Sequence, residues 1–164
     1  MITFDDEKSR AVGWVLWRVE GVGHVTLERL TERVESLAEL PDLGRAALER
    51  LFDRVEMRES AAETLLDDGG LGRPVRALHE ELDRLPPDTA LCARGDADYP
   101  ARFDALEEPP VFLYVQGEGK ALHTARTVAI VGSRDARTKG VRFSRALASG
   151  LARRGAAVIS GGAI

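Results

Sequence analysis

Two glycine-containing turns near the end of the chain carry residue types that bind phosphate. Each turn directly follows an apolar run, and the six residues are Gly132, Ser133, Arg134, Ser160, Gly161 and Gly162. Glycine lets the backbone approach a phosphate closely, hydroxyls and free amides donate to its oxygens, and arginine adds a bidentate positive charge. The two turns therefore predict an anion-binding site.

The elements around these turns form the pattern of a βαβ unit. Residues 128–131 are a continuous apolar, β-branched run, as expected for a parallel strand buried on both faces. Residues 138–154 have helical periodicity, and residues 156–159 form the next strand. Because successive parallel strands are usually neighbours, both turns should leave the carboxyl edge of one sheet. Lys139, at the start of the helix, is a further candidate phosphate contact.

The charge of the chain is divided unevenly along the sequence. The net charge is −4, but residues 120–164 contain nine Lys or Arg and one acid, which gives +8. The preceding residues contain 14 basic and 26 acidic side chains and so carry −12. A basic α/β segment behind an acidic one indicates an anionic ligand for the basic segment alone.

The first half of the chain has the pattern of a small helical domain. Residues 11–19 form an apolar helix, a Gly-Val-Gly turn follows, and an amphipathic helix starts at Thr26 with apolar residues to Leu37. Two helices joined by such a turn resemble a helix-hairpin-helix, whose amides can bind a nucleic-acid phosphate. Nearby glutamates favour a structural or protein-contact role. Further helices are predicted at residues 43–55, 60–66 and 73–85.

Pro86 and Pro87 end the helical part, so the sequence predicts domains at residues 1–85 and 86–164. Residues 91–93 and 111–115 are predicted strands, with a short helix at 101–106 between them. We expect residues 111–115 to lead into the parallel sheet. The overall prediction is an α/β class, with an all-helical domain followed by the start of a Rossmann-like domain.

Several classes of function are disfavoured by the sequence. Cys92 is the single cysteine and the three histidines are scattered, so no zinc spacing occurs. Neither a dinucleotide-binding nor a Walker-type glycine motif is present, and no cofactor is expected. No long apolar segment occurs and the N-terminus is too acidic for a signal peptide, so we expect a cytoplasmic protein that does not enter a membrane.

Four motifs in order resemble the DprA (Smf) family of DNA-processing proteins. They are an Asp-x-x-Tyr-Pro turn at Asp96, Tyr99 and Pro100, a Pro-Pro strand-Gly segment at 109–117, a Val-Ala-Ile-Val-Gly-Ser-Arg turn, and a Ser-Gly-Gly turn. The helical domain with its Gly-Val-Gly hairpin is similar to the sterile-alpha-motif-like domain of that family. The family continues beyond the equivalent of Ile164, so we expect an incomplete and marginally stable α/β portion.

This resemblance implies a recombination mediator without catalytic activity. It implies binding of single-stranded DNA, loading of the RecA recombinase during natural transformation, and a homodimer in the full-length protein. The phosphate pocket would be lined by the six turn residues named above. Since phosphate contacts carry no sequence information, base-specific readout is not expected, and Phe143 is expected to pack on the sheet rather than stack on a base.

Two other functions remain open at this stage. Related folds with glycine-rich strand ends include phosphoribohydrolases of the lysine-decarboxylase-like type, which bind nucleoside phosphates and need a carboxylate near the glycosidic bond. Asp135 is the acid nearest to the predicted pocket, and an ordinary turn residue is its simpler interpretation. The third possibility is an interaction module whose acidic helical domain binds a protein partner.

Overall fold

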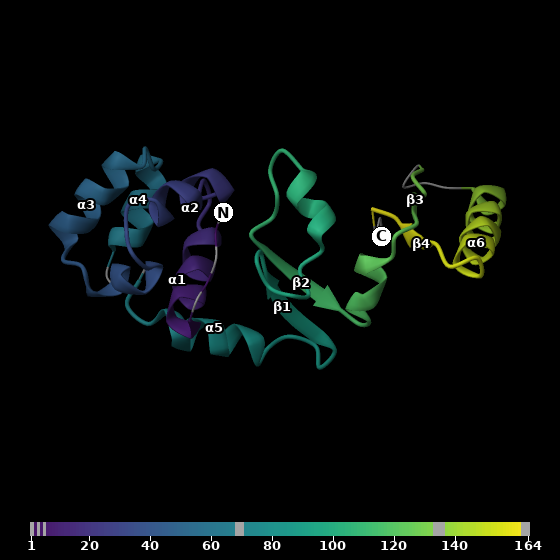
Figure 1. Ribbon diagram of the computed structural model, residues 1–164, viewed down its shortest axis with the longest axis horizontal. Coiled ribbons are helices and arrows are strands. Elements are labelled where there is room, and N and C mark those ends of the chain that lie inside the picture. Colours follow the sequence, from purple (N-terminus) through teal and green to yellow (C-terminus); the bar gives the residue numbers. More distant parts are fainter. Residues whose placement is uncertain (1, 3, 5, 68–70, 133–136, 162–164) are drawn as a thin grey trace. The chain divides into compact units, whose positions relative to one another are not determined.

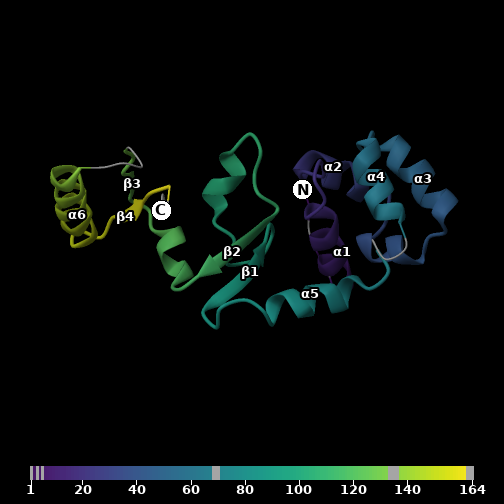
Figure 2. The ribbon, with the colours of Figure 1, turned by 180° about the vertical axis from the view of Figure 1, so that it is seen from behind.

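The computed structural model describes residues 2, 4, 6–67, 71–132 and 137–161. These residues form two compact units, unit 1 (residues 1–117) and unit 2 (residues 118–164), which we describe one at a time. Figure 1 and Figure 2 show their helices and strands from opposite sides. The units are defined by spatial contacts, and the domain boundary at residue 85 stays a prediction.

Unit 1 begins with helices close to the predicted ranges. They are α1 (Glu7–Trp17), α2 (His24–Thr31), the 3-10 helix η1 (Leu37–Asp42), α3 (Arg45–Arg54), α4 (Glu59–Leu66) and α5 (Pro74–Leu82). The α2 helix ends at Thr31 rather than continuing to Leu37. Ser36 explains the break, because its side chain accepts a hydrogen bond from the Ala38 amide and so caps a separate helix.

The core of unit 1 lies around α1, which packs against α2, α5 and η1. Asp6 caps this helix by accepting a hydrogen bond from the Ser9 amide, and Val12 and Leu16 are fully buried. Gly13 lies under the Phe4 ring, since a Cβ added there would be only 2.2 Å from the ring. This close approach of ring and helix backbone requires glycine.

A β-hairpin completes unit 1. Strands β1 (Thr89–Ala93) and β2 (Phe112–Gln116) pair antiparallel, and the 3-10 helix η2 (Ala101–Ala105) lies in the connection between them. We expected residues 111–115 to lead into the parallel sheet, but β2 belongs to this separate two-stranded sheet. The reason is that Phe112 is buried by unit 1, with ring centroids of Phe4 and Trp17 at 5.0 and 5.6 Å.

Unit 2 contains the predicted βαβ arrangement. It comprises the 3-10 helix η3 (Gly119–His123), β3 (Thr127–Ala129), α6 (Thr138–Ala152) and β4 (Ala157–Ile159), and β3 and β4 pair in parallel. Gly155, at φ +74°, ends the helical segment in the left-handed conformation that favours glycine. The fold thus combines helices with small sheets that include a parallel pair. The resemblance of the helical part to a sterile-alpha-motif domain, and of the α/β part to a Rossmann-like domain, stays a prediction.

No helix in the described part of the chain has both the length and the apolar character needed to cross a bilayer.

Candidate nucleic-acid interface

The described residues of the two predicted turns leave the sheet at the carboxyl edge of the β3–β4 pair. Thr127 pairs with Ala157 and Ala129 with Ile159, and the Ile130 amide donates to the Ile159 carbonyl at 2.8 Å. Since the strands run in the same direction and in this register, Gly132 and Ser160 leave the sheet at the same edge. The predicted juxtaposition of the two turns is therefore present in the described residues.

The structure describes four of the seven predicted site residues. Gly132, Ser160 and Gly161 lie at the shared edge and are exposed, and Lys139 is exposed in the first turn of α6. Ser133, Arg134 and Gly162 lie outside the described residues. The structure thus places one residue of the first turn and two of the second at one edge.

Space is open around both described glycines of this edge. A Cβ added at Gly132 or at Gly161 would meet no heavy atom within 4 Å beyond its chain neighbours, and neither backbone lies in the left-handed region. Neither steric packing nor conformation requires glycine at these positions. A bound ligand that approaches the backbone closely would require glycine at these positions.

The α6 helix follows the first predicted turn in the chain and carries donors and positive charge. The first amides of this helix have no acceptor within the helix, and no side chain among the described residues caps them. Lys139, Arg142 and Arg145 are exposed and take part in no described ion pair, while Arg153 donates to Ser149 Oγ at 2.6 Å. Because these cations are not neutralised by described carboxylates, they attract a polyanion.

Phe143 corrects one of our expectations. We predicted that Phe143 packs on the sheet, but it is 69% exposed and does not. The partly buried residues of α6 are instead Ser144, Ala148, Gly150 and Leu151. Phe143 and Lys139 are four residues apart and therefore neighbours on the helix surface. A flat apolar ring beside a cation is a combination suited to an unpaired nucleotide.

The Asp-x-x-Tyr-Pro turn lies in unit 1 and has a structural environment. Tyr99 and Pro100 are buried, and the Tyr99 hydroxyl donates to the Pro110 carbonyl at 2.8 Å. Burial is the main cause that raises the pKa of the Tyr99 phenol, so this donor stays protonated over the physiological range. Asp96 is paired with Arg10 of α1. Sequence reasoning missed that pairing, because 86 residues separate its two partners.

Metal or thiol chemistry finds no support in the part of the chain that is described. No cluster of three or more His, Cys, Asp or Glu side chains with metal-binding geometry occurs there. Cys92 is buried, and burial is the main cause that raises the pKa of its thiol, so the thiolate form is disfavoured at neutral pH.

Comparison with known proteins finds one family match, in the second half of the chain. Residues 90–164 match the family model described as DNA recombination-mediator protein A. No curated protein and no solved structure matches the chain. The matched segment covers the hairpin of unit 1 and all of unit 2, and so includes every predicted phosphate-binding residue. The match over residues 90–164 supports the assignment to the DprA (Smf) family that the four motifs predicted.

Proposed function

We propose that this protein is a single-stranded DNA-binding recombination mediator. In this proposal it binds strands taken up during natural transformation, loads the RecA recombinase onto them, acts in the cytoplasm as a homodimer, and catalyses no reaction itself. The family match supports a role in DNA processing and recombination. The observation that carries the proposal is the shared edge of β3 and β4, where Gly132, Ser160 and Gly161 lie exposed in a basic segment.

The mechanism follows from the donors at this edge. Backbone amides and the Ser160 hydroxyl donate to phosphate oxygens, and the N-terminal end of α6 adds a favourable dipole. In this proposal Arg134 and Ser133 complete the pocket, and Gly162 extends the second turn. Lys139 contributes a further phosphate contact. Such contacts fix the path of the backbone but do not read sequence.

Preference for a single strand over a duplex is supported by Phe143. In a duplex the bases are stacked inside, so an exposed ring on α6 gains nothing from them. In a single strand a base can stack on the ring beside a phosphate held by Lys139. We expect Phe143→Ala to weaken binding of an oligo-dT strand about fivefold or more. Phe143→Tyr, which keeps the ring, should retain most of the affinity.

The deciding experiment measures binding of a fluorescent oligo-dT strand across a salt series. Arg134→Ala and Lys139→Ala are compared with Arg84→Ala, which removes an exposed charge from unit 1. We expect the first two variants to lose affinity and to reduce the salt slope by about 0.7 for each phosphate that the variant no longer neutralises. Arg84→Ala should behave as the wild type. Equal binding by all three variants would refute the assigned pocket.

Competition distinguishes the mediator from the enzyme alternative. We expect an unlabelled single strand to displace the probe at lower concentration than duplex DNA or a nucleoside monophosphate. If the monophosphate competes best, the pocket belongs to a small molecule and a phosphoribohydrolase becomes the better proposal. The loading step is tested separately, by following RecA filament assembly on a strand coated with single-strand binding protein.

A further inference from the structure

Two ion pairs of opposite polarity connect the N-terminal helices to the turn that follows β1. Arg10 of α1 donates to Asp96, with an Nη1 to Oδ1 distance of 3.0 Å and a second contact from Nη2 to Oδ2. Arg94 donates in the other direction, to Glu28 of α2 at 3.4 Å. The helices thus supply one cation and one anion, and the turn supplies the complementary anion and cation.

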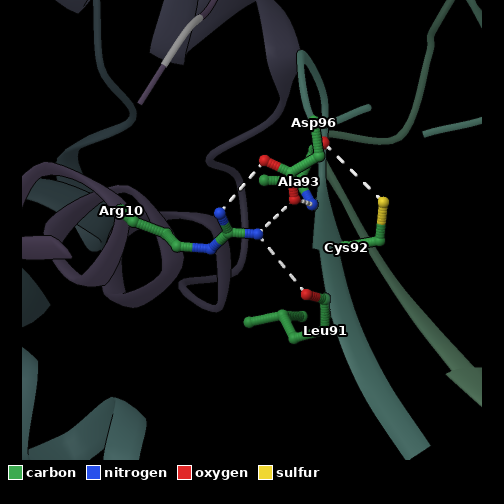
Figure 3. Close-up of polar contacts among 5 residues, drawn as sticks. All are labelled: Arg10, Leu91, Cys92, Ala93 and Asp96. Carbon is green, nitrogen blue, oxygen red and sulfur yellow. Dashed lines mark hydrogen bonds and ion pairs between the residues drawn. The ribbon is translucent and has the colours of Figure 1, made fainter. Parts of the chain in front are cut away.

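The turn that carries these charges is held rigidly. Asp96 accepts a hydrogen bond from the Ala93 amide at 2.8 Å, and its own amide donates to the Ala93 carbonyl at 3.0 Å. Gly95 adopts a φ of +98°, which lets the chain reverse between the two charged residues. Figure 3 shows that the Arg10 guanidinium also contacts the Leu91 carbonyl. Arg10 Nη2 donates to this oxygen at 3.4 Å. Arg10 therefore contacts both β1 and its turn.

Both arginines are largely withdrawn from solvent. The Arg10 and Asp96 side chains are 27% and 31% exposed, and Arg94 is only 12% exposed. Arg94 has a second partner in Asp104 of η2, at 2.8 Å. Charge pairs with this degree of burial are screened less by salt than those on an open surface. Loss of one partner also leaves the other charge poorly solvated.

Aromatic contacts continue the same junction along α1. Trp17 packs on Phe112 of β2, and the Trp14 indole donates to the Tyr114 hydroxyl at 2.9 Å. Trp14 and Trp17 are the two tryptophans of the chain. Their fluorescence therefore reports on the contact between α1 and the hairpin.

We propose that the Arg10–Asp96 and Arg94–Glu28 pairs form a reciprocal charge latch that joins the hairpin, residues 89–116, to the helices of residues 6–82 in one cooperative folding unit. The start of the family-matched segment then depends on helices that lie before it in the sequence. The Asp-x-x-Tyr-Pro turn acts in the fold and not in the phosphate site. Opposite polarities also disfavour a shifted docking, which would bring like charges together.

The latch is tested in the full chain with Arg10→Met, which keeps the local Asp96–Ala93 bond but removes the link to α1. We expect the tryptophan-detected melting temperature to fall by about 3 °C or more. Hydrogen exchange of the β1 and β2 amides should accelerate at least tenfold. The matched control is Glu80→Gln, which breaks the exposed Arg76–Glu80 pair of α5 and should change neither measurement.

Two further variants keep the test decisive. If Arg10→Met does not fold, Arg10→Lys retains the charge with fewer donors and should give an intermediate loss. Arg94→Met tests the reverse pair. It should likewise lower the tryptophan-detected melting temperature and accelerate hydrogen exchange of the β1 and β2 amides. The proposal is overturned if hairpin exchange stays at the wild-type rate in Arg10→Met, or if hairpin and helices unfold in separate transitions. Binding of oligo-dT is not used as a readout, so the outcome is independent of the proposed function.

Discussion

Unit 1 and unit 2 differ in charge and in how their apolar side chains are used. Unit 1 has 14 basic and 25 acidic residues and buries a continuous core around α1. Unit 2 has nine basic and two acidic residues, and none of its described residues is buried. Six large apolar side chains that unit 2 leaves exposed are Val128, Val131, Val141, Phe143, Leu147 and Ile159. Unit 1 thus has a core of its own, whereas unit 2 carries the proposed phosphate-binding residues and has little core in its described part.

The difference in burial predicts a large difference in local stability. Two hydrogen-bonded strands without a covered face are marginal in water. We expect amides of β1 and β2 to exchange on the order of a hundredfold more slowly, relative to their intrinsic rates, than those of β3 and β4. Hydrogen exchange of the full chain, followed by mass spectrometry, measures this ratio. Equal protection of both sheets would show that unit 2 is covered, and our expectation of a marginal α/β portion would be wrong.

One substitution in each unit sharpens the comparison. Phe112 is 1% exposed, so Phe112→Ala should destabilise unit 1 by about 3–5 kcal/mol. Ile159 is 50% exposed, so Ile159→Ala should cost less than about 1 kcal/mol. Urea unfolding followed by tryptophan fluorescence measures the first change, and hydrogen exchange of β4 measures the second. Comparable losses in the two variants would mean that Ile159 is buried in solution.

Local patterns in the sequence predicted most elements, because each pattern reports forces that act between near neighbours. The continuous apolar run at residues 128–131 predicted a parallel strand, and helical periodicity predicted the helix from Thr138. Both elements are present, but β3 spans Thr127–Ala129 and is exposed, so the prediction that it is buried on both faces is wrong. The pairing of β2 was not predicted correctly. Its apolar sequence fits any partly buried strand, and the choice of partner depends on Phe4 and Trp17, which lie about a hundred residues away in the chain.

The candidate site shows the same division. The candidate glycines, hydroxyls and cations could be located from the sequence, and the parallel pairing of β3 and β4 brings Gly132 and Ser160 to one edge. The exposure of Phe143 could not be predicted, since an apolar residue on an amphipathic helix is normally covered. The Arg10–Asp96 pair left no signal in either local segment, because neither residue interrupts the pattern around it.

Gly132→Ala separates the ligand chemistry of unit 2 from its stability. The added methyl meets no protein atom within 4 Å, so the fold should tolerate it within about 0.5 kcal/mol. If the backbone at Gly132 contacts phosphate, affinity for oligo-dT should fall about tenfold because one charge-assisted hydrogen bond is no longer made. Gly150→Ala, inside α6, is the control and should leave affinity unchanged. Unchanged affinity in Gly132→Ala would remove this residue from the pocket.

The smallest expected effect is a pH dependence confined to unit 1. Burial alone would raise the pKa of Asp96, but the Arg10 hydrogen bond, the Ala93 amide and the Arg10 charge together hold that pKa below its usual value. The Cys92 thiol also lies near this carboxylate, and because its pKa is raised it stays neutral in acid. A carboxyl with a lowered folded pKa contributes stability above its unfolded pKa of about 3.9 and loses that contribution as pH falls through the folded value.

Asp96→Asn should therefore be less stable than the wild type at pH 6. The difference should shrink as pH falls below the unfolded pKa of about 3.9 and through the lowered pKa of the folded carboxyl. Melting of both proteins by tryptophan fluorescence at several pH values measures this convergence. Hydrogen exchange in β3 and β4 should show no such difference between the two proteins, because Asp96 belongs to unit 1. A stability gap that is constant from pH 6 to pH 3 would mean that Asp96 acts through the shape of its turn, with no contribution from its charge.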